Sequence, residues 1–295
     1  MKSVIFSRFF ILLPWVLIVI IMIDIDTKRT FRSPVSARQR SQRTTAANLS
    51  ALPVIYAITP TYNRPVQKAE LTRLGQVFRQ VPRLHWILVE DSSTRSDLVS
   101  RFLARCGVAA YTHLNIFTPR RFKRAGMPRA TEQRNVALTW LRQHRGRKDA
   151  GVVFFADDDN TYSLELFDEM RSTKGVSVWP VGFVGGRAYE RPLVVAGKVV
   201  GWYTGWRPDR PFATDMAGFA VNLQVVFSNP RAQFKRRGSQ PGMQESDFLR
   251  QITKVSELEP KANNCTRVLV WHTRTEKPHL ANEPKHRKDT VYIEV

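Results

Sequence analysis

The sequence predicts an α/β fold in which a mostly parallel sheet is covered by helices on both faces. Two features lead to this prediction. Strand-like apolar runs alternate with helical patterns from about residue 54 to residue 172, as expected when each strand is followed by a helix that crosses back over the sheet. The runs are also continuously apolar, which is typical of strands buried on both faces.

The predicted elements follow one another in a regular order. Strands are expected at residues 54–58, 86–89, 111–117 and 151–156, and helices between them near 66–81, 98–103 and 131–144. The first helix is indicated by Leu71, Leu74 and Phe78, at a spacing close to one helical turn. After Ser172, short strands and turns replace the alternation, and we expect a hairpin between residues 176 and 200.

The chain before residue 53 has a different composition. Residues 9–23 form an unbroken apolar run, which suits one membrane helix of about 20 residues. A cleaved signal peptide is the alternative, but no small-x-small cleavage site follows Ile23. The Ser-, Thr-, Arg- and Gln-rich residues that follow resemble a flexible stem. The predicted organisation is a cytoplasmic tail (1–8), a signal-anchor helix (9–25), a stem (26–52), a first globular lobe (53–172) and a second lobe with a polar tail (173–295).

Two sequons, Asn48-Leu49-Ser50 and Asn264-Cys265-Thr266, favour a lumenal position for the part that follows the anchor. The two cysteines, Cys106 and Cys265, are too few for a disulfide framework and have no zinc-site spacing. Whether these two cysteines pair stays open.

The chain carries 46 Lys and Arg against 25 Asp and Glu, a formal net charge of +21. Such a charge calls for an anionic partner, which could be nucleic acid, a membrane surface, a nucleotide sugar or an acidic glycan. The sequence contains no GxGxxG, P-loop, GxSxG or HExxH motif, so nicotinamide enzymes, P-loop kinases and serine hydrolases of standard type lose support.

The strongest candidate site lies where three predicted strands end. Ligands of open α/β sheets bind at the carboxyl ends of strands, and these ends carry Tyr62, Glu90-Asp91 and Asp157-Asp158-Asp159. Three adjacent carboxylates repel one another unless a cation or strong donors lie close, and hard oxygen ligands suit Mg²⁺ or Mn²⁺. The alternative is that these acids simply precede a helix near Ser163 and interact with its dipole.

Other candidates are weaker on local sequence alone, because each has a common structural explanation. Tyr62 and Trp206 could stack on a ligand or fill a core, and Arg129 and Arg134 could clamp phosphates or lie at the surface. His272 follows a strand-like run, and Glu245 lies at an apparent helix start, where acids are frequent.

Several longer motifs together resemble the animal β1,3-glucuronyltransferase family over residues 53 to about 279. They are Thr59-Pro60-Thr61-Tyr62, residues 84–91, Glu132-Gln133-Arg134-Asn135, residues 155–162, residues 176–182, residues 215–220, Gln244-Glu245-Ser246, Asn264-Cys265-Thr266 and residues 270–278. The resemblance implies a GT-A-like glycosyltransferase fold, with a Rossmann-like UDP-sugar-binding lobe (53–172) and a smaller mixed acceptor-binding lobe (173–295). It also implies a type II Golgi membrane protein that uses Mn²⁺ and forms a homodimer.

The resemblance also implies roles for individual residues. Donor-binding positions match Pro60, Tyr62, Asp91, Arg129, Arg134, Asp157, Asp158, His272 and Arg274, and Asp159 matches the direct Mn²⁺ ligand. Acceptor-binding positions match Glu190, Trp206, Arg210 and Asp215, and Glu245 matches the catalytic base. The expected reaction is the inverting transfer of glucuronic acid from UDP-glucuronate to the 3-hydroxyl of a terminal galactose.

Two alternatives remain for the acceptor. Trp206 resembles the branch of the family that builds the Gal-Gal-Xyl linker of proteoglycans, which we favour, whereas residues 234–238 resemble the branch that acts on N-acetyllactosamine ends. A catalytically inactive glycan-binding module is a second class of function. A nucleic-acid binder is a third, but the predicted anchor and sequons oppose it, and no RNP-type or helix-turn-helix signature is present.

Overall fold

The computed structural model describes residues 51–124, 127–236, 238–240, 242–284, 291 and 293–294. The predicted cytoplasmic tail, anchor helix and nearly all of the stem, including Asn48, lie outside these residues. Within the described ranges, no helix combines the length and the apolar character needed to span a membrane.

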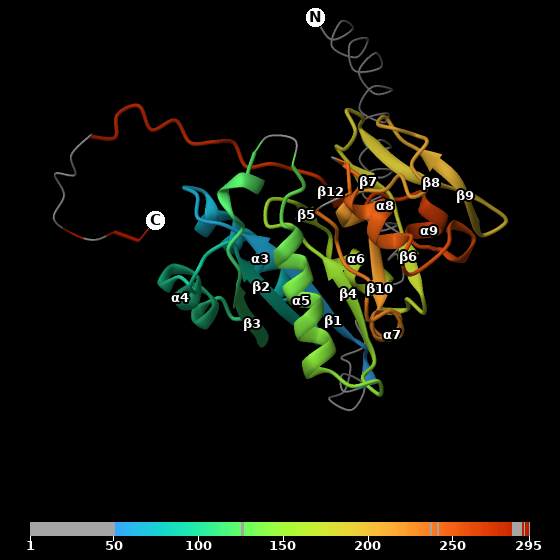
Figure 1. Cartoon of the computed structure of the whole chain (residues 1–295), viewed down its shortest axis with the longest axis horizontal. Coiled ribbons are helices and arrows are strands. Elements are labelled where there is room, and N and C mark those ends of the chain that lie inside the picture. The colour runs from blue at the N-terminus through green and yellow to red at the C-terminus, as the bar shows by residue number, and fades with distance from the viewer. Residues whose placement is uncertain are drawn as a thin grey trace, which may run out of the picture. The chain divides into compact units, whose positions relative to one another are not determined.

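A large mixed sheet forms the centre of the unit that begins at Leu52 (Figure 1). Within the part of the chain that is described, it contains seven strands in the order β11-β6-β10-β4-β1-β2-β3. Their bounds are β1 (Val54–Thr61), β2 (Leu84–Glu90), β3 (Ala110–Asn115), β4 (Gly151–Phe155), β6 (Val176–Val178), β10 (Phe219–Asn222) and β11 (Glu259–Pro260). The four strands from β4 to β3 are parallel, whereas β10 runs antiparallel to both β4 and β6. The predicted α/β architecture is therefore confirmed.

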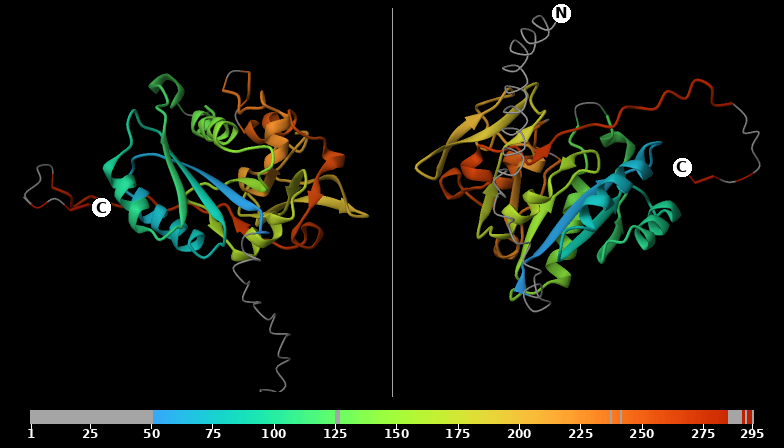
Figure 2. Two further views of the ribbon diagram at one scale, coloured as in Figure 1. Left: turned by 90° about the horizontal axis from the view of Figure 1, so that it is seen from below. Right: turned by 180° about the vertical axis from the view of Figure 1, so that it is seen from behind.

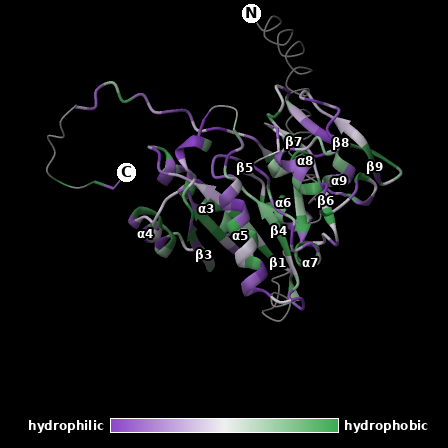
Figure 3. Ribbon diagram, in the orientation of Figure 1, coloured by the Kyte–Doolittle hydropathy of each residue, from purple (hydrophilic) through white to green (hydrophobic). Residues whose placement is uncertain are grey.

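Helices cover both faces of this sheet, as its continuously apolar strands predict. One face packs on α3 (Gln67–Phe78), α4 (Asp97–Arg105) and α6 (Leu164–Arg171), and the other on α5 (Thr131–His144), α7 (Leu223–Ser228) and α8 (Gln244–Leu249). Successive β1 residues divide between the two cores, with Ile55 in one and Tyr56 in the other. Figure 2 shows α3 and α5 on opposite sides of β1, and Figure 3 shows apolar residues concentrated on the central strands.

A smaller sheet lies beside the first. In the described residues it has the order β5-β12-β7-β8-β9, with β5 (Thr161–Tyr162), β7 (Val181–Gly182), β8 (Tyr189–Val195), β9 (Lys198–Tyr203) and β12 (Val270–Trp271). The predicted hairpin is formed by β8 and β9. It turns at Ala196 and Gly197, which have φ angles of 47° and 73°, a conformation that glycine adopts at little cost.

The chain from Leu52 onward forms one compact unit. Strands β6, β10 and β11 follow residue 172 in the sequence, yet they complete the sheet begun by β1 to β4. The predicted boundary between a donor lobe and an acceptor lobe therefore falls within one shared sheet. The remaining elements are η1 (Arg120–Phe122), η2 (Met216–Gly218), η3 (Val255–Glu257) and α9 (Ala262–Cys265).

Candidate active site

The carboxyl ends of β1, β2 and β4 lie at one edge of the large sheet because these strands are parallel and neighbouring. Register pairs Thr61 with Glu90 and Ile58 with Phe155. The residues that follow, Tyr62, Asp91 and the Asp157–Asp159 cluster, therefore gather at this edge, as predicted. Pro60 lies in β1 itself, opposite Val89.

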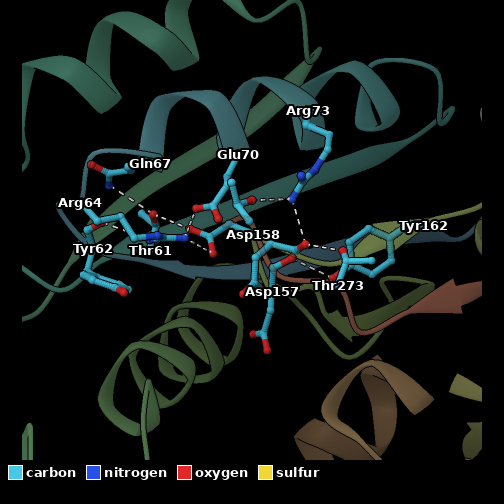
Figure 4. Close-up of polar contacts among 12 residues, drawn as sticks. Thr61, Tyr62, Arg64, Gln67, Glu70, Arg73, Asp157, Asp158, Tyr162 and Thr273 are labelled. Atoms are coloured by element: carbon cyan, nitrogen blue, oxygen red, sulfur yellow. Dashed lines mark hydrogen bonds and ion pairs between the residues drawn. The ribbon is translucent and has the colours of Figure 1, made fainter. Parts of the chain in front are cut away.

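Asp158 points into the protein (Figure 4). The Thr61 hydroxyl donates to Asp158 Oδ2 at 2.8 Å, and Arg64 Nη2 lies 2.7 Å from Oδ1. Burial raises the pKa of Asp158 to about 6, and the Arg64 guanidinium opposes this rise. Arg64 also pairs with the buried Glu70 of α3. The Asp158 carboxylate thus secures the turn that carries its two neighbours.

Asp157 and Asp159 flank this anchor. Asp157 Oδ1 lies 2.7 Å from Nη2 of the buried Arg134 on α5. The main-chain oxygen of Asp159 accepts hydrogen bonds from Arg73 Nη2 at 2.8 Å and from Thr273 Oγ1 at 2.6 Å. Burial raises the pKa of the half-buried Asp159 carboxyl, and the nearby Asp157 charge raises it further. This is the environment of a carboxylate that a cation would stabilise.

The donor set can be tested against a divalent metal. No group of three His, Cys, Asp or Glu side chains within the described ranges could hold a metal by itself. If a divalent ion binds here, Asp159 could supply one carboxylate, and a bound diphosphate would have to supply further oxygens, as is common for Mg²⁺-like ions. The residues present fit a cation shared with a nucleotide, and they do not fit a metal site built from protein alone.

Tyr62 and Asp91 lie at the outer part of the same edge. Tyr62 is 49% exposed, and the Arg64 guanidinium lies 4.4 Å from its ring centroid. Asp91 Oδ1 accepts a hydrogen bond from the Thr118 amide at 2.7 Å, and Lys123 Nζ lies 3.0 Å from Oδ2. The main-chain oxygen of Arg129 accepts a hydrogen bond from Arg134 Nη1 at 3.1 Å.

A pocket of about 670 Å³ adjoins this edge. It brings together seven of the predicted residues: Glu190, Trp206, Arg210, Asp215, Glu245, His272 and Arg274. They come from β8, the loop after β9, α8 and the segment after β12. The lining also includes Phe183, Val184, Gly185, Gly186, Thr214 and Gly242, which sequence reasoning missed. The adjacent glycines of this set are the one signal that could have drawn attention to it.

The pocket wall is held by hydrogen bonds from neighbouring loops. Glu190 Oε1 accepts from Thr204 Oγ1 and from the Gly205 amide, both at 2.6 Å. The Arg210 guanidinium lies 4.6 Å from the Trp206 ring centroid, and its Nη2 donates to the Trp206 main-chain oxygen at 3.1 Å. A side chain at Gly242 would overlap the Trp206 ring. The half-exposed Trp206 is therefore fixed in its orientation.

Glu245 is the most chemically distinctive residue of the pocket. Burial, together with the nearby Asp215 charge, raises its pKa to about 7, and Arg134 and Arg210 partly oppose the rise. Asp215 Oδ2 lies 3.4 Å from His272 Nδ1. That contact raises the pKa of His272 despite its burial. A carboxyl that titrates near neutrality beside an open pocket suits a general base.

Both cysteines lie in the described part of the chain, and both are free, which resolves the open question of their pairing. Asn264 of the second sequon is exposed in α9.

Comparison with known proteins agrees with the resemblance found in the sequence. Residues 74–276 match glycosyltransferase family 43. Galactosylgalactosylxylosylprotein 3-beta-glucuronosyltransferase 2 of Homo sapiens is 66% identical over 324 aligned positions, which cover 100% of both chains. Galactosylgalactosylxylosylprotein 3-beta-glucuronosyltransferase 1 of the same species is 58% identical over 243 positions, covering 79% of this chain and 72% of that one. Among solved structures, S. aureus TarS aligns with a TM-score of 0.44 and 15% identity, covering 75% of this chain and 60% of that chain. The chain therefore belongs to glycosyltransferase family 43, among the galactosylgalactosylxylosylprotein 3-beta-glucuronosyltransferases.

Proposed function

We propose that this chain is an inverting glucuronosyltransferase, which moves glucuronic acid from UDP-glucuronate to the 3-hydroxyl of the terminal galactose in the Gal-Gal-Xyl linker of proteoglycans. The observation that carries the proposal is the pocket in which Glu245, with its pKa near 7, lies among Glu190, Trp206 and Arg210. The names of the relatives, with identities of 66% and 58%, support the same donor chemistry and the same acceptor.

Inversion requires a single in-line displacement at the anomeric carbon. The acceptor oxygen forms a bond to that carbon while the bond from the carbon to the UDP oxygen breaks. The attacking hydroxyl must lose its proton, and Glu245 is a pocket carboxylate whose pKa is raised by burial to about 7. Asp215 maintains that pKa through its charge. Glu245 therefore receives the proton, and UDP leaves with the bonding electron pair.

The donor is anionic at both its diphosphate and its glucuronate, and the site offers cationic groups for it. Arg134 is held at the strand edge by Asp157, while His272 and Arg274 lie in the pocket wall. Preorganised cations of this kind stabilise the charge that develops on the leaving group. A divalent cation such as Mn²⁺, held by Asp159 and the diphosphate, would contribute further to that stabilisation.

The proposal is tested by transfer assays with the purified full-length chain, UDP-glucuronate and Mn²⁺. A Gal-Gal-Xyl linker analogue and N-acetyllactosamine are offered separately, and transfer to the first is expected. Transfer to N-acetyllactosamine alone would instead favour the other branch of the family. UDP binding without transfer to either would favour an inactive glycan-binding module and refute the proposal.

The metal proposal has its own test. We expect chelation to abolish transfer and Asp159→Ala to do the same at saturating Mn²⁺. Asp168→Ala is the matched control, because Asp168 is an exposed acid on α6 away from the strand edge. Full activity of the wild type in chelator would exclude a metal role for Asp159.

We also propose a location and an assembly. The apolar run at residues 9–23 and the sequons support a type II Golgi membrane protein with a lumenal catalytic part. The family resemblance supports a homodimer. Protease protection of the catalytic part in sealed Golgi vesicles, and sedimentation of the purified chain, test these two points separately.

A further inference from the structure

Phe183 is an exposed aromatic residue held in a left-handed backbone conformation. Its φ angle is 60°, and its side chain is 61% exposed. Left-handed φ is uncommon for any residue other than glycine, and it is costly for a bulky one. Because the Phe183 side chain is mostly exposed, burial in a core offsets little of that cost. Strain of this kind, when it lies beside a pocket, suggests a role in binding.

The turn that carries Phe183 is fixed by its neighbours. The Phe183 amide donates to the Ala188 oxygen at 2.9 Å, and the Arg187 amide donates to the Val184 oxygen at 3.1 Å. Gly185, inside this turn, packs so closely on Glu190 that a side chain there would overlap the Glu190 carboxylate. The strained backbone of Phe183 therefore cannot relax without displacing an acceptor-side residue of the pocket.

Phe183 is also one of the residues that line the pocket. It shares that lining with Trp206, Glu190 and Glu245, and it lies just before the β8–β9 hairpin, whereas Trp206 lies just after it. Within the described residues, the Phe183 ring makes no contact with another aromatic ring or with a cation of the kinds that hold Trp206 and Phe122. The ring is therefore available to a molecule that occupies the pocket.

Sugars offer a matching surface. One face of a galactopyranose ring exposes several C–H groups in a row, and such a face packs well on an aromatic ring, whose π surface is electron-rich. The hydroxyls on the other side of the sugar remain free for the carboxylates and Arg210.

We propose that Phe183 is an acceptor-contacting residue that stacks on the C–H face of a pyranose and thereby helps to set acceptor specificity. The inference rests on the proposed function, because it assigns a further residue to the same pocket. Phe183 supplies one aromatic wall, and Trp206 supplies another.

The test uses the purified full-length chain and three variants at position 183. Phe183→Asn removes the ring but tolerates the left-handed backbone, since Asn adopts it more readily than most residues. Phe183→Tyr and Phe183→Trp keep an aromatic ring. Tyr111→Asn is the matched control, because Tyr111 is an exposed aromatic residue on β3 outside the pocket lining.

We expect Phe183→Asn to raise KM for the Gal-Gal-Xyl acceptor about tenfold, the effect of losing an apolar contact of some tens of Å². KM for UDP-glucuronate and the acceptor-independent hydrolysis of the donor should not change. The Tyr, Trp and Tyr111→Asn variants should stay within about twofold of the wild type for the acceptor. The melting temperature of Phe183→Asn should equal or exceed that of the wild type, because the strain is reduced.

An unchanged acceptor KM in Phe183→Asn would overturn the inference, as would an equal loss in the Tyr and Trp variants. A wild-type chain that transfers to no acceptor would instead refute the proposed function. In that case calorimetric titration of the wild type and Phe183→Asn with the same saccharide still decides the inference, since equal affinities would overturn it and a weaker affinity in Phe183→Asn would support it.

Discussion

Glu245 gives the sharpest prediction for a single residue. Glu245→Gln keeps the shape of the side chain and removes its ability to accept the acceptor proton. We expect transfer to fall by about 10²- to 10⁴-fold, the usual contribution of a general base, while UDP affinity measured by calorimetry stays within twofold. A large loss of UDP affinity in this variant would show that Glu245 serves binding and would contradict the base assignment.

The same variant makes a stability prediction with a definite sign. The pKa of Glu245 is raised by burial from 4.5 to about 7, so the folded state prefers the neutral carboxyl. The wild type therefore loses stability as pH rises from 4.5 through 7, by up to about 3 kcal/mol. Chemical denaturation should find Glu245→Gln more stable than the wild type at pH 8 and equal to it at pH 4. Equal stability of the two proteins at both pH values would mean that folding does not raise the pKa of Glu245.

The charge of Asp215 sets a further prediction, for the pH profile of the reaction. A base with a pKa near 7 gives a kcat/KM that rises through pH 7. Asp215 contributes to the raised pKa of Glu245, so Asp215→Asn should move the rising limb of the kcat/KM profile to lower pH. A change in acceptor KM would alter the height of the profile and not the position of this limb. His272 faces Asp215 as well and loses its proton as pH rises, so His272→Gln is needed to assign any falling limb. If the rising limb of the kcat/KM profile stays at the same pH in Asp215→Asn, the Asp215 charge does not set the pKa of the base.

The residues that could be predicted individually share one feature. The Asp157–Asp159 cluster is visible because it directly follows a buried strand, so its position at the sheet edge comes from the local pattern. Glu190 and Phe183 have no such signal, because the pocket is assembled from four segments far apart in sequence. Glu190 was assigned through the family resemblance, and Phe183 was not assigned at all. The strained φ angle that marks Phe183 appears only in three dimensions.

Among the elements, the segment around η1 contacts Asp91 directly. Lys123 Nζ lies 3.0 Å from Asp91 Oδ2 and 4.8 Å from the Phe117 ring centroid. Gln133 of α5 anchors the segment by donating to the Ile116 oxygen at 3.0 Å. If Asp91 holds uridine, Lys123 must move or share the carboxylate. In that case Lys123 would compete with the nucleotide for Asp91.

We accordingly expect Lys123→Met to tighten uridine binding about two- to fivefold at low salt, the range of a partly exposed ion pair. The nucleoside is used because a phosphate would itself attract Lys123. Arg120→Met, on the same turn, is the control and should leave the affinity unchanged. Weaker uridine binding by Lys123→Met in calorimetric titration would show that Lys123 is a ligand of the nucleotide rather than its competitor.

Elements with a complete local signal were predicted closely. The helix predicted at 131–144 has those bounds in the structure, and strand 54–58 extends only three residues further, to Thr61. The short strands β5, β7, β11 and β12 have two residues each. Such strands exist through pairing with distant partners, so their own patterns indicate them weakly, although β12 lies in the strand-like run that precedes His272.

At the scale of the whole molecule, the two predicted lobes depend on each other. Strand β4 lies between β1, which precedes residue 172, and β10, which follows it. The ring of Phe155 in β4 contacts Phe219, Phe234 and Phe248, with centroids 5.0 to 5.8 Å apart. A first lobe alone would expose both the edge of β4 and this aromatic cluster. A composition change in the sequence can mark different binding roles, but it cannot show that the two halves share one core.

This shared core predicts that the donor and acceptor halves unfold together. We expect one cooperative unfolding transition. UDP with Mn²⁺ should raise its free energy of unfolding by about 2.7 kcal/mol at a hundredfold excess over Kd. Hydrogen exchange should show the slowest amides of β2 and of β10 protected to the same extent by the ligand, although most of the residues expected to bind UDP belong to the first half. Residues 53–172 expressed alone should not fold, because β4 lacks its partner strand. Two transitions, with UDP shifting only one, would mean that the lobes are independent and that the sheet does not couple the donor site to the acceptor pocket.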